Sequence, residues 1–289
     1  MTSRAERIAD AFKWACLAEL DAPKPGNVHA FAAGHRMTVD EFVRSADAAA
    51  VPLSAEGTRV GVRIDAAVAA TFAAVGTNTN LGIILLCAPL AAAAERDAAS
   101  TGLRGALGDV LRDLDVDDAN LAFRAIVRAA PAGLGRSACH DVFNPATVTL
   151  LQAMAEAADR DLVAREYATD FADIFDLGLP LLEAAGESGV DPKWATLATF
   201  LGFLSASPDS HIARKFGAER AQAVQHQAAI FQRRLRAREE PTQLLPALLA
   251  WDSALKGKGI NPGTSADLTV STLFAYRLRT ILPFARNSD

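Results

Sequence analysis

The chain has 289 residues and a formal net charge of −5, with 51% hydrophobic and 7% aromatic residues. This length is enough to bury a sizeable core in one or two domains. The acidic balance argues against a nucleic-acid-binding protein with a broad basic surface, although small acidic metabolites stay admissible ligands. The alanine-rich, aromatic-poor composition favours helices over sheets.

The cysteines and the apolar runs bear on the cellular compartment. Cys16, Cys87 and Cys139 are odd in number and far apart, which indicates reduced thiols rather than disulfides or metal ligands. The first residues enter a helical pattern without the layout of a signal peptide. The most apolar run, 81–94, is shorter than the ~20 residues of a membrane span. We therefore expect a cytoplasmic protein, not bound to membranes, in which 81–94 is a buried core helix.

Helical periodicity predicts nearly every element of the chain. The alternation of a half-buried strand is nearly absent, and connections are short, so we expect an all-α, single-domain multi-helix bundle over residues 1–289. Polar loops between the helices are expected to converge on a central pocket. The predicted helices cover 5–20, 39–50, 59–75, 81–95, 102–113, 117–130, 145–164, 166–186, 192–206, 217–237, 242–256 and 265–282.

The first polar segment, 23–29, has the sequence Pro-Lys-Pro-Gly-Asn-Val-His. Its two prolines hold Lys24 in an extended conformation, and its glycine frees the backbone to bend. A stiffened lysine followed by Asn27 and His29 suits contact with a phosphate or a base, and His35 follows closely. The alternative is a helix stopped by proline, with a lysine in solvent.

The second and third polar segments leave more than one interpretation open. The second, 76–82, lies between two apolar predicted helices, so Asn78 and Asn80 either cap the following helix or face a ligand. The third, 133–145, is rich in glycine and holds Arg136 near a histidine and an aspartate. It fits a mobile lid, a rigid anion-binding loop or a plain surface connection.

The fourth polar segment, 207–217, combines an acid, an imidazole and two cations within seven residues. Asp209 is placed to cap a short helix that carries His211, Arg214 and Lys215 within one turn. This set of groups suits the binding of a metal and a triphosphate. The alternative is a charged corner between two helices.

The fifth polar segment, 261–268, opens the last predicted helix with more polar groups than a helix start needs. Thr264 or Ser265 alone would suffice as the cap, yet Asn261 and a Pro-Gly turn precede them and Asp267 follows in the expected first turn. A phosphate, or a metal bridging one, fits such a helix start. An ordinary cap with a well-placed carboxylate is the alternative.

In order, these segments resemble motifs of the triphosphoribosyl-dephospho-CoA synthase family, and the likeness extends over about residues 10–280. Residues 23–29 resemble a family Pro-Lys-Pro-Gly-Leu-Val-Asp pattern, and 34–37 resemble a shortened Gly-Ala-His-Lys-Asp-Met. Residues 78–82 are similar to Asn-Thr-His-Lys-Gly, without its histidine and lysine. Residues 209–217 resemble Asp-Thr-Asn-x-x-x-Arg-x-Gly, and the fifth segment resembles Ser-Pro-Gly-Gly-Ser-Ala-Asp-Leu.

The resemblance implies an all-α transferase that uses ATP as a substrate and Mg²⁺ as a cofactor. In the family reaction the 2′-hydroxyl of dephospho-CoA attacks C1′ of the ATP ribose, adenine leaves, and the triphosphate stays on the transferred sugar. Its partners are small nucleotide and cofactor-precursor molecules, and a homodimer is an open alternative. The implied catalytic residues are Asp209, Asp267, His211 and His29, of which the two carboxylates are also metal candidates. The implied substrate-binding residues are Lys24, Asn27, His35, Asn78, Asn80, Arg136, Arg214, Lys215, Asn261 and Ser265.

Two departures from the family pattern bear on the acceptor. His29 stands where the family has an acid, and Asn80 and Leu81 stand where it has His-Lys. A divergent branch that transfers a phosphoribosyl-type group in tetrahydromethanopterin- or methanofuran-linked cofactor biosynthesis is therefore an alternative. A nucleotide-binding helical protein without catalysis and a metal-dependent hydrolase are the two further alternatives.

Overall fold

The computed structural model describes residues 2–30, 38–96, 101–131, 135–136, 139–187, 189–237 and 239–282. Across these ranges the chain forms fourteen α-helices and one π-helix, with no β-strand. The predicted all-α fold is confirmed. In the described part of the chain, no helix is long and apolar enough to cross a membrane.

The chain divides into two compact units, each of which is described by itself. Unit 1 comprises Met1–Ala15, Glu41–Ala172 and Phe274–Asp289, and unit 2 comprises Cys16–Asp40 and Asp173–Leu273. Three helices, α1 (Arg4–Leu20), α2 (Val39–Leu53) and α14 (Gly263–Ile281), begin in one unit and end in the other. The single domain expected from the sequence stays a prediction.

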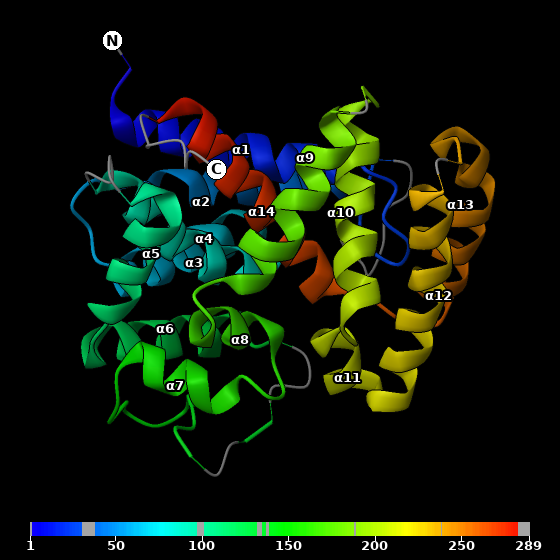
Figure 1. The fold of residues 1–289 in the computed structure, drawn as a ribbon. Coiled ribbons are helices and arrows are strands. Elements are labelled where there is room, and N and C mark those ends of the chain that lie inside the picture. The colour runs from blue at the N-terminus through cyan, green and yellow to red at the C-terminus, as the bar shows by residue number, and fades with distance from the viewer. Residues whose placement is uncertain are drawn as a thin grey trace. The chain divides into compact units, whose positions relative to one another are not determined.

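Unit 1 is organised around the apolar helix α4 (Figure 1). Helix α4 packs against α3, α5, α6 and α8. Twelve of its fifteen residues are buried, which confirms the core helix predicted at 81–94. The helices of this unit are α2 (Val39–Leu53), α3 (Val60–Val75), α4 (Leu81–Glu95), α5 (Gly102–Arg112), α6 (Val116–Ala129), α7 (Leu150–Ala157) and α8 (Leu162–Ala168), with parts of α1 and α14.

The structure breaks two of the predicted helices. The helix expected at 145–164 is interrupted because the Asp161 carboxylate accepts hydrogen bonds from the Val163 and Ala164 N–H groups and starts α8 as a new helix. The helix expected at 166–186 is interrupted at Asp170 and Phe171, which have positive φ. A π-helix, η1 (Asp173–Gly178), and then α9 (Leu179–Glu187) follow. Apolar residues continue through both breaks, so periodicity does not reveal them.

Unit 2 consists of helices that pack around a second apolar core. Helix α10 packs against α9 and α12, and α11 packs against α12 (Figure 1). The helices are α10 (Pro192–Ala206), α11 (Ser210–Phe216), α12 (Ala218–Arg236) and α13 (Pro241–Gly257), after η1 and α9. The Phe231 and Trp251 rings stack with centroids 5.2 Å apart, which joins α12 to α13. The core includes Leu197, Phe200, Leu201, Leu204, Ile212, Val224, Leu244, Leu248, Leu255 and Ile260.

Candidate functional site at the start of α14

The N-terminal end of α14 is the point at which three polar segments of unit 2 meet. A Cβ atom on Gly263 would lie 2.7 Å from Nδ1 of His211, so the imidazole of α11 lies directly against the first residue of α14. The Ser210 and Thr264 hydroxyl oxygens are 3.0 Å apart and share a hydrogen bond. The His211 main-chain N–H donates to the same Thr264 oxygen at 3.2 Å. The fourth and fifth polar segments are thereby joined.

Asp209 is the central acceptor of this junction. It is fully buried, and its Oδ2 accepts hydrogen bonds from both the N–H and the hydroxyl of Ser265 at 2.8 Å. Its Oδ1 accepts from the Ile212 N–H at 3.1 Å, which confirms the predicted cap of the short helix. Burial raises the pKa of Asp209, and the hydrogen bonds that it accepts oppose this shift. One carboxylate thus fixes the starts of two helices.

The first polar segment lies against the turn that leads into α14. Gly26 has φ of +84°, and a Cβ atom there would lie 2.9 Å from Cδ of Pro262 and 3.1 Å from the Ile260 carbonyl oxygen. The Asn27 side-chain amide donates to Oδ1 of Asn261 at 2.8 Å. The pairing of these two amides brings the first and fifth segments together.

Replacing Gly26 by alanine is expected to destabilise the protein by about 3 kcal/mol, because the new side chain meets both a left-handed backbone and a packed neighbour. Gly76 provides the control, since its φ of 72° and ψ of 4° are left-handed and nothing lies within 4 Å of its Cβ position. Gly76→Ala should cost only the backbone part, about 1 kcal/mol. Urea denaturation of both variants measures the difference, and equal losses would contradict the close approach at Gly26.

Lys24 lies inside the protein as one half of a buried ion pair. Its ammonium donates to the carbonyl oxygens of Glu19 and Val28 at 2.7 and 2.8 Å and lies 2.9 Å from Oε1 of Glu19. Neither side chain is exposed. Burial lowers the pKa of Lys24 and raises that of Glu19, while the attraction between the two charges opposes both shifts. Lys24 therefore links the end of α1 to the first polar segment through buried contacts.

His29 belongs to a cluster with two residues of α13. Its Nε2 lies 3.4 Å from Oδ1 of Asp252 and 3.4 Å from Nζ of Lys256. Lys256 also pairs with Asp252 at 2.9 Å. Burial lowers the pKa of His29, Asp252 opposes this shift, and Lys256 adds to it. His29 is therefore a neutral imidazole near pH 7, held beside a carboxylate.

The start of α14 differs from the cap that the sequence suggested. Thr264 and Ser265 are not the cap, because α14 begins at Gly263 and both residues lie in its first turn. The acceptor of the Ser265 N–H is Asp209, the residue that caps α11. Asp267 lies beyond the first turn and is partly buried.

The two cations of α11 differ in exposure. Arg214 is partly buried, and Lys215 is exposed with its ammonium 5.1 Å from the centroid of the Phe216 ring. Within the ranges that the structure describes, no three histidine, cysteine, aspartate or glutamate residues lie together so as to hold a metal ion. Both oxygens of the buried Asp209 carboxylate accept hydrogen bonds from the protein, so this carboxylate joins the two helix starts.

Three candidate residues belong to unit 1, and one lies outside the described residues. Asn78 accepts a hydrogen bond from the Leu81 N–H at 3.1 Å, whereas Asn80 precedes α4 without making a side-chain cap. Arg136 is exposed and lies 3.6 Å from Asp141. His35 falls in the range 31–37, outside the described residues.

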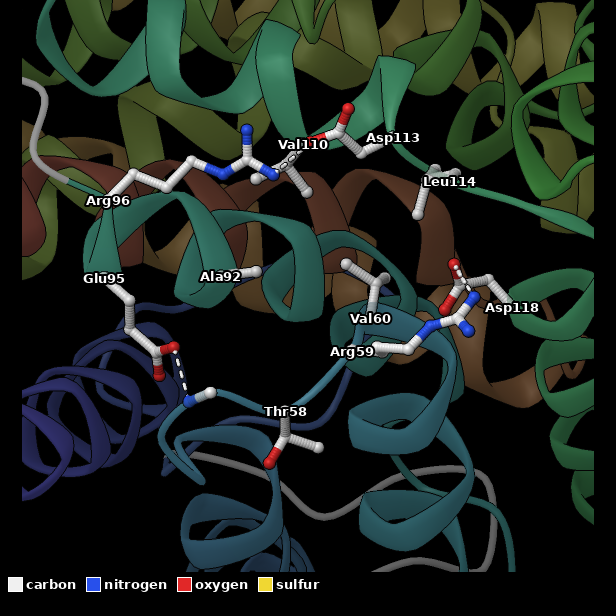
Figure 2. A pocket seen from close by; sticks show the side chains of 11 residues that line it. Thr58, Arg59, Val60, Ala92, Glu95, Arg96, Val110, Asp113, Leu114 and Asp118 are labelled. Atoms are coloured by element: carbon white, nitrogen blue, oxygen red, sulfur yellow. Dashed lines mark hydrogen bonds and ion pairs between the residues drawn. The ribbon is translucent and has the colours of Figure 1, made fainter.

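Unit 1 contains a cavity of about 290 Å³ that includes none of the predicted site residues (Figure 2). Val60, Ala92, Val110 and Leu114 form its apolar part. Its charged side chains already have partners in the protein: Arg59 with Asp118, Arg96 with Asp113, and Glu95 with Arg63. This pairing indicates a junction between helices rather than a nucleotide site.

Sequence reasoning missed Glu19, Asp252 and Lys256. Glu19 lies in the last turn of α1, five residues before Lys24, and an acid at that distance is a usable signal for an ion pair. Asp252 and Lys256 are separated by four residues on α13, which places them on one face of the helix. Nothing in their own neighbourhood indicates that this face meets residues more than 220 positions earlier in the chain.

The structure defines an all-helical protein in which polar loops meet at the start of one helix. A sequence model of the ATP:dephospho-CoA triphosphoribosyl transferase family (CitG) matches residues 5–284. The chain belongs to this family.

The proteins similar to this chain include an enzyme and a protein of known structure. A 2-(5″-triphosphoribosyl)-3′-dephosphocoenzyme-A synthase from Pectobacterium atrosepticum is 32% identical over 115 residues, which are 40% of this chain and 36% of that enzyme. The alignment thus spans about a third of the relative's length. A crystal structure from Archaeoglobus fulgidus, provisionally assigned as a triphosphoribosyl-dephospho-CoA synthase, has a TM-score of 0.61 and 24% identity. The structural match covers 80% of this chain and 95% of the Archaeoglobus fulgidus chain. At 24% identity, this match shows a similar fold and nothing more.

Proposed function

We propose that the protein is a transferase that moves the triphosphoribosyl group of ATP to dephospho-CoA and releases adenine. The observation that carries this proposal is the meeting of the first, fourth and fifth polar segments at the start of α14. Family membership supplies the reaction type. A small-molecule site is the expected use of buried polar loops that converge in this way.

The transfer makes three chemical demands on the site. Breaking the N-glycosidic bond generates an oxocarbenium-like centre, which a nearby carboxylate stabilises, and we assign this role to Asp267. The departing adenine needs a hydrogen-bond donor, for which the paired amides of Asn27 and Asn261 are candidates. The attacking 2′-hydroxyl must lose its proton, and His29 and His211 are the described imidazoles beside the junction.

The triphosphate is expected to bind at the start of α14, with Arg214 and Lys215 as its cations. We propose that Mg²⁺ enters with ATP as part of the substrate, because protein-bound Mg²⁺ is usually held by substrate phosphates together with only one or two carboxylates. In this proposal Asp209, Ser265 and Lys24 act by holding the loops in place. Roles for His35, Asn78, Asn80 and Arg136, a cytoplasmic location and a homodimer stay predictions.

The proposal is tested by incubating the purified protein with ATP, Mg²⁺ and dephospho-CoA and following adenine by chromatography. We expect one adenine per molecule of triphosphoribosylated acceptor, and no adenine when Mg²⁺ or the acceptor is left out. Adenine formed with a pterin or furan precursor but not with dephospho-CoA would favour the divergent acceptor. Adenine formed without any acceptor would indicate a hydrolase.

A further inference from the structure

Asp252 connects α13 to two points of the first polar segment. Its side chain is almost fully buried, and its Oδ1 accepts the Gly26 main-chain N–H at 2.8 Å and faces Nε2 of His29 at 3.4 Å. Lys256, one turn further along α13, lies 2.9 Å from Oδ1 and 3.0 Å from Oδ2 of the same carboxylate. One acid thus fixes both the backbone and an imidazole of a segment that precedes it by more than 220 residues.

We propose that Asp252 is a positioning residue, which holds His29 and the backbone at Gly26 in the arrangement that the transfer reaction needs. This inference rests on the proposed function and deepens it by assigning a role to a residue of α13. Asp252 acts through His29 and does not itself contact the reacting atoms.

The geometry supports a positioning role in two ways. The two contacts lie three residues apart, at the left-handed Gly26 and at the end of the segment, so together they fix its curvature. The acid itself is held on a regular helix whose neighbouring residue, Trp251, stacks on Phe231 of α12. A reactive imidazole works best when a second group fixes its orientation and tautomer.

The charged groups that act on His29 include Asp252, Lys256 and Lys24. Burial has the largest effect and lowers the pKa of the ring; both lysines lower it further, and Asp252 raises it. The net result keeps the ring neutral at pH 7, as a proton acceptor requires. The Asp252 carboxylate accepts from Nε2–H when that nitrogen carries the proton of the neutral ring, and Nζ of Lys256 lies at the same distance of 3.4 Å from Nε2.

Asp252→Asn separates this role from a merely structural one. The asparagine side-chain oxygen can still accept the Gly26 N–H, so the segment keeps its backbone contact. The negative charge beside His29 is lost, which removes the group that raises its pKa. Asp191→Asn is the matched control, because Asp191 is an exposed helix-capping acid of the same unit.

The first measurement uses ¹⁵N NMR of the histidine rings in the full-length protein without substrate. We expect the wild-type His29 resonances to indicate the Nε2–H tautomer, with titration at a pH below the ordinary value of 6.5. In Asp252→Asn the titration should move to lower pH and the tautomer preference should weaken. An unchanged tautomer and titration in this variant would overturn the proposal.

The second measurement is a double-mutant cycle on kcat for adenine release. We expect Asp252→Asn to lower kcat about tenfold with KM for ATP little changed, and His29→Asn to lower it about a hundredfold. The double variant should match His29→Asn alone, because Asp252 acts through that ring. If the double variant lost the product of the two single losses in kcat, the positioning role would be contradicted. An unchanged kcat in Asp252→Asn would contradict it as well.

The two measurements also separate this inference from the proposed function. Wild-type protein that releases no adenine with any acceptor contradicts the proposed function, whereas the NMR titration still decides whether Asp252 orients His29. Adenine release that is insensitive to Asp252→Asn leaves the function intact and rejects the inference. Asp191→Asn should change neither readout.

Discussion

Lys24→Met is expected to destabilise the protein by about 3–5 kcal/mol, the usual cost of removing one partner from a buried ion pair. The methionine fills the space of the lysine but leaves the Glu19 carboxylate buried without its cation. The carbonyl oxygens of Glu19 and Val28 also lose their donor. Heat or urea denaturation at pH 7 measures the loss.

Two further variants show whether the loss at Lys24 comes from the ion pair. Glu19→Gln in the Lys24→Met background removes the uncompensated charge and should recover part of the stability. Lys258→Met replaces an exposed lysine of the same unit and should leave the stability unchanged. If Lys24→Met behaved like Lys258→Met, Lys24 would be a solvated lysine, and the shape of the first polar segment would need another cause.

Asp209→Ala is expected to cost about 3 kcal/mol and to weaken ATP binding more than tenfold. The substitution leaves the Ile212 N–H and both donors of Ser265 without their acceptor in a buried place, and each such group costs about 1–3 kcal/mol. The start of α14, to which we assign triphosphate binding, loses the two hydrogen bonds by which Asp209 holds Ser265. Denaturation and calorimetric titration with MgATP measure the two effects.

Ser265→Ala is the matched control for Asp209→Ala. It removes one of the three hydrogen bonds and leaves no buried donor unpaired, so it should cost about 1 kcal/mol. ATP binding should then be close to that of the wild type. Equal losses in the two variants would mean that Asp209 does not organise the junction.

Much of the fold follows from periodicity in the sequence. The apolar run at 81–94 becomes α4, and the acid at Asp209 caps α11 as its position predicts. The breaks near Asp161 and Phe171 do not follow from periodicity. A capping side chain causes the first break, and positive φ at non-glycine residues marks the second, whereas the hydrophobic pattern continues through both.

The sequence predicts which polar segments contribute to the site, but it does not predict which side chains contact one another there. The sequence indicates the polar segments, because buried polar groups need partners. It does not reveal that Lys24 turns inward to Glu19, since a lysine between prolines is equally compatible with solvent. From the sequence around it, Asp252 is indistinguishable from any other acidic residue on a helix. Only the packing of α13 brings it to Gly26 and His29.

Hydrogen exchange with and without MgATP tests most directly whether the junction at the start of α14 is the nucleotide site. We expect MgATP to slow amide exchange in 23–29, 209–216 and 261–266, because these segments form the junction in unit 2. The cavity residues 57–60 of unit 1 provide an internal comparison and should be unaffected. MgATP that binds and slows exchange elsewhere, while these three segments stay unchanged, would contradict the assignment.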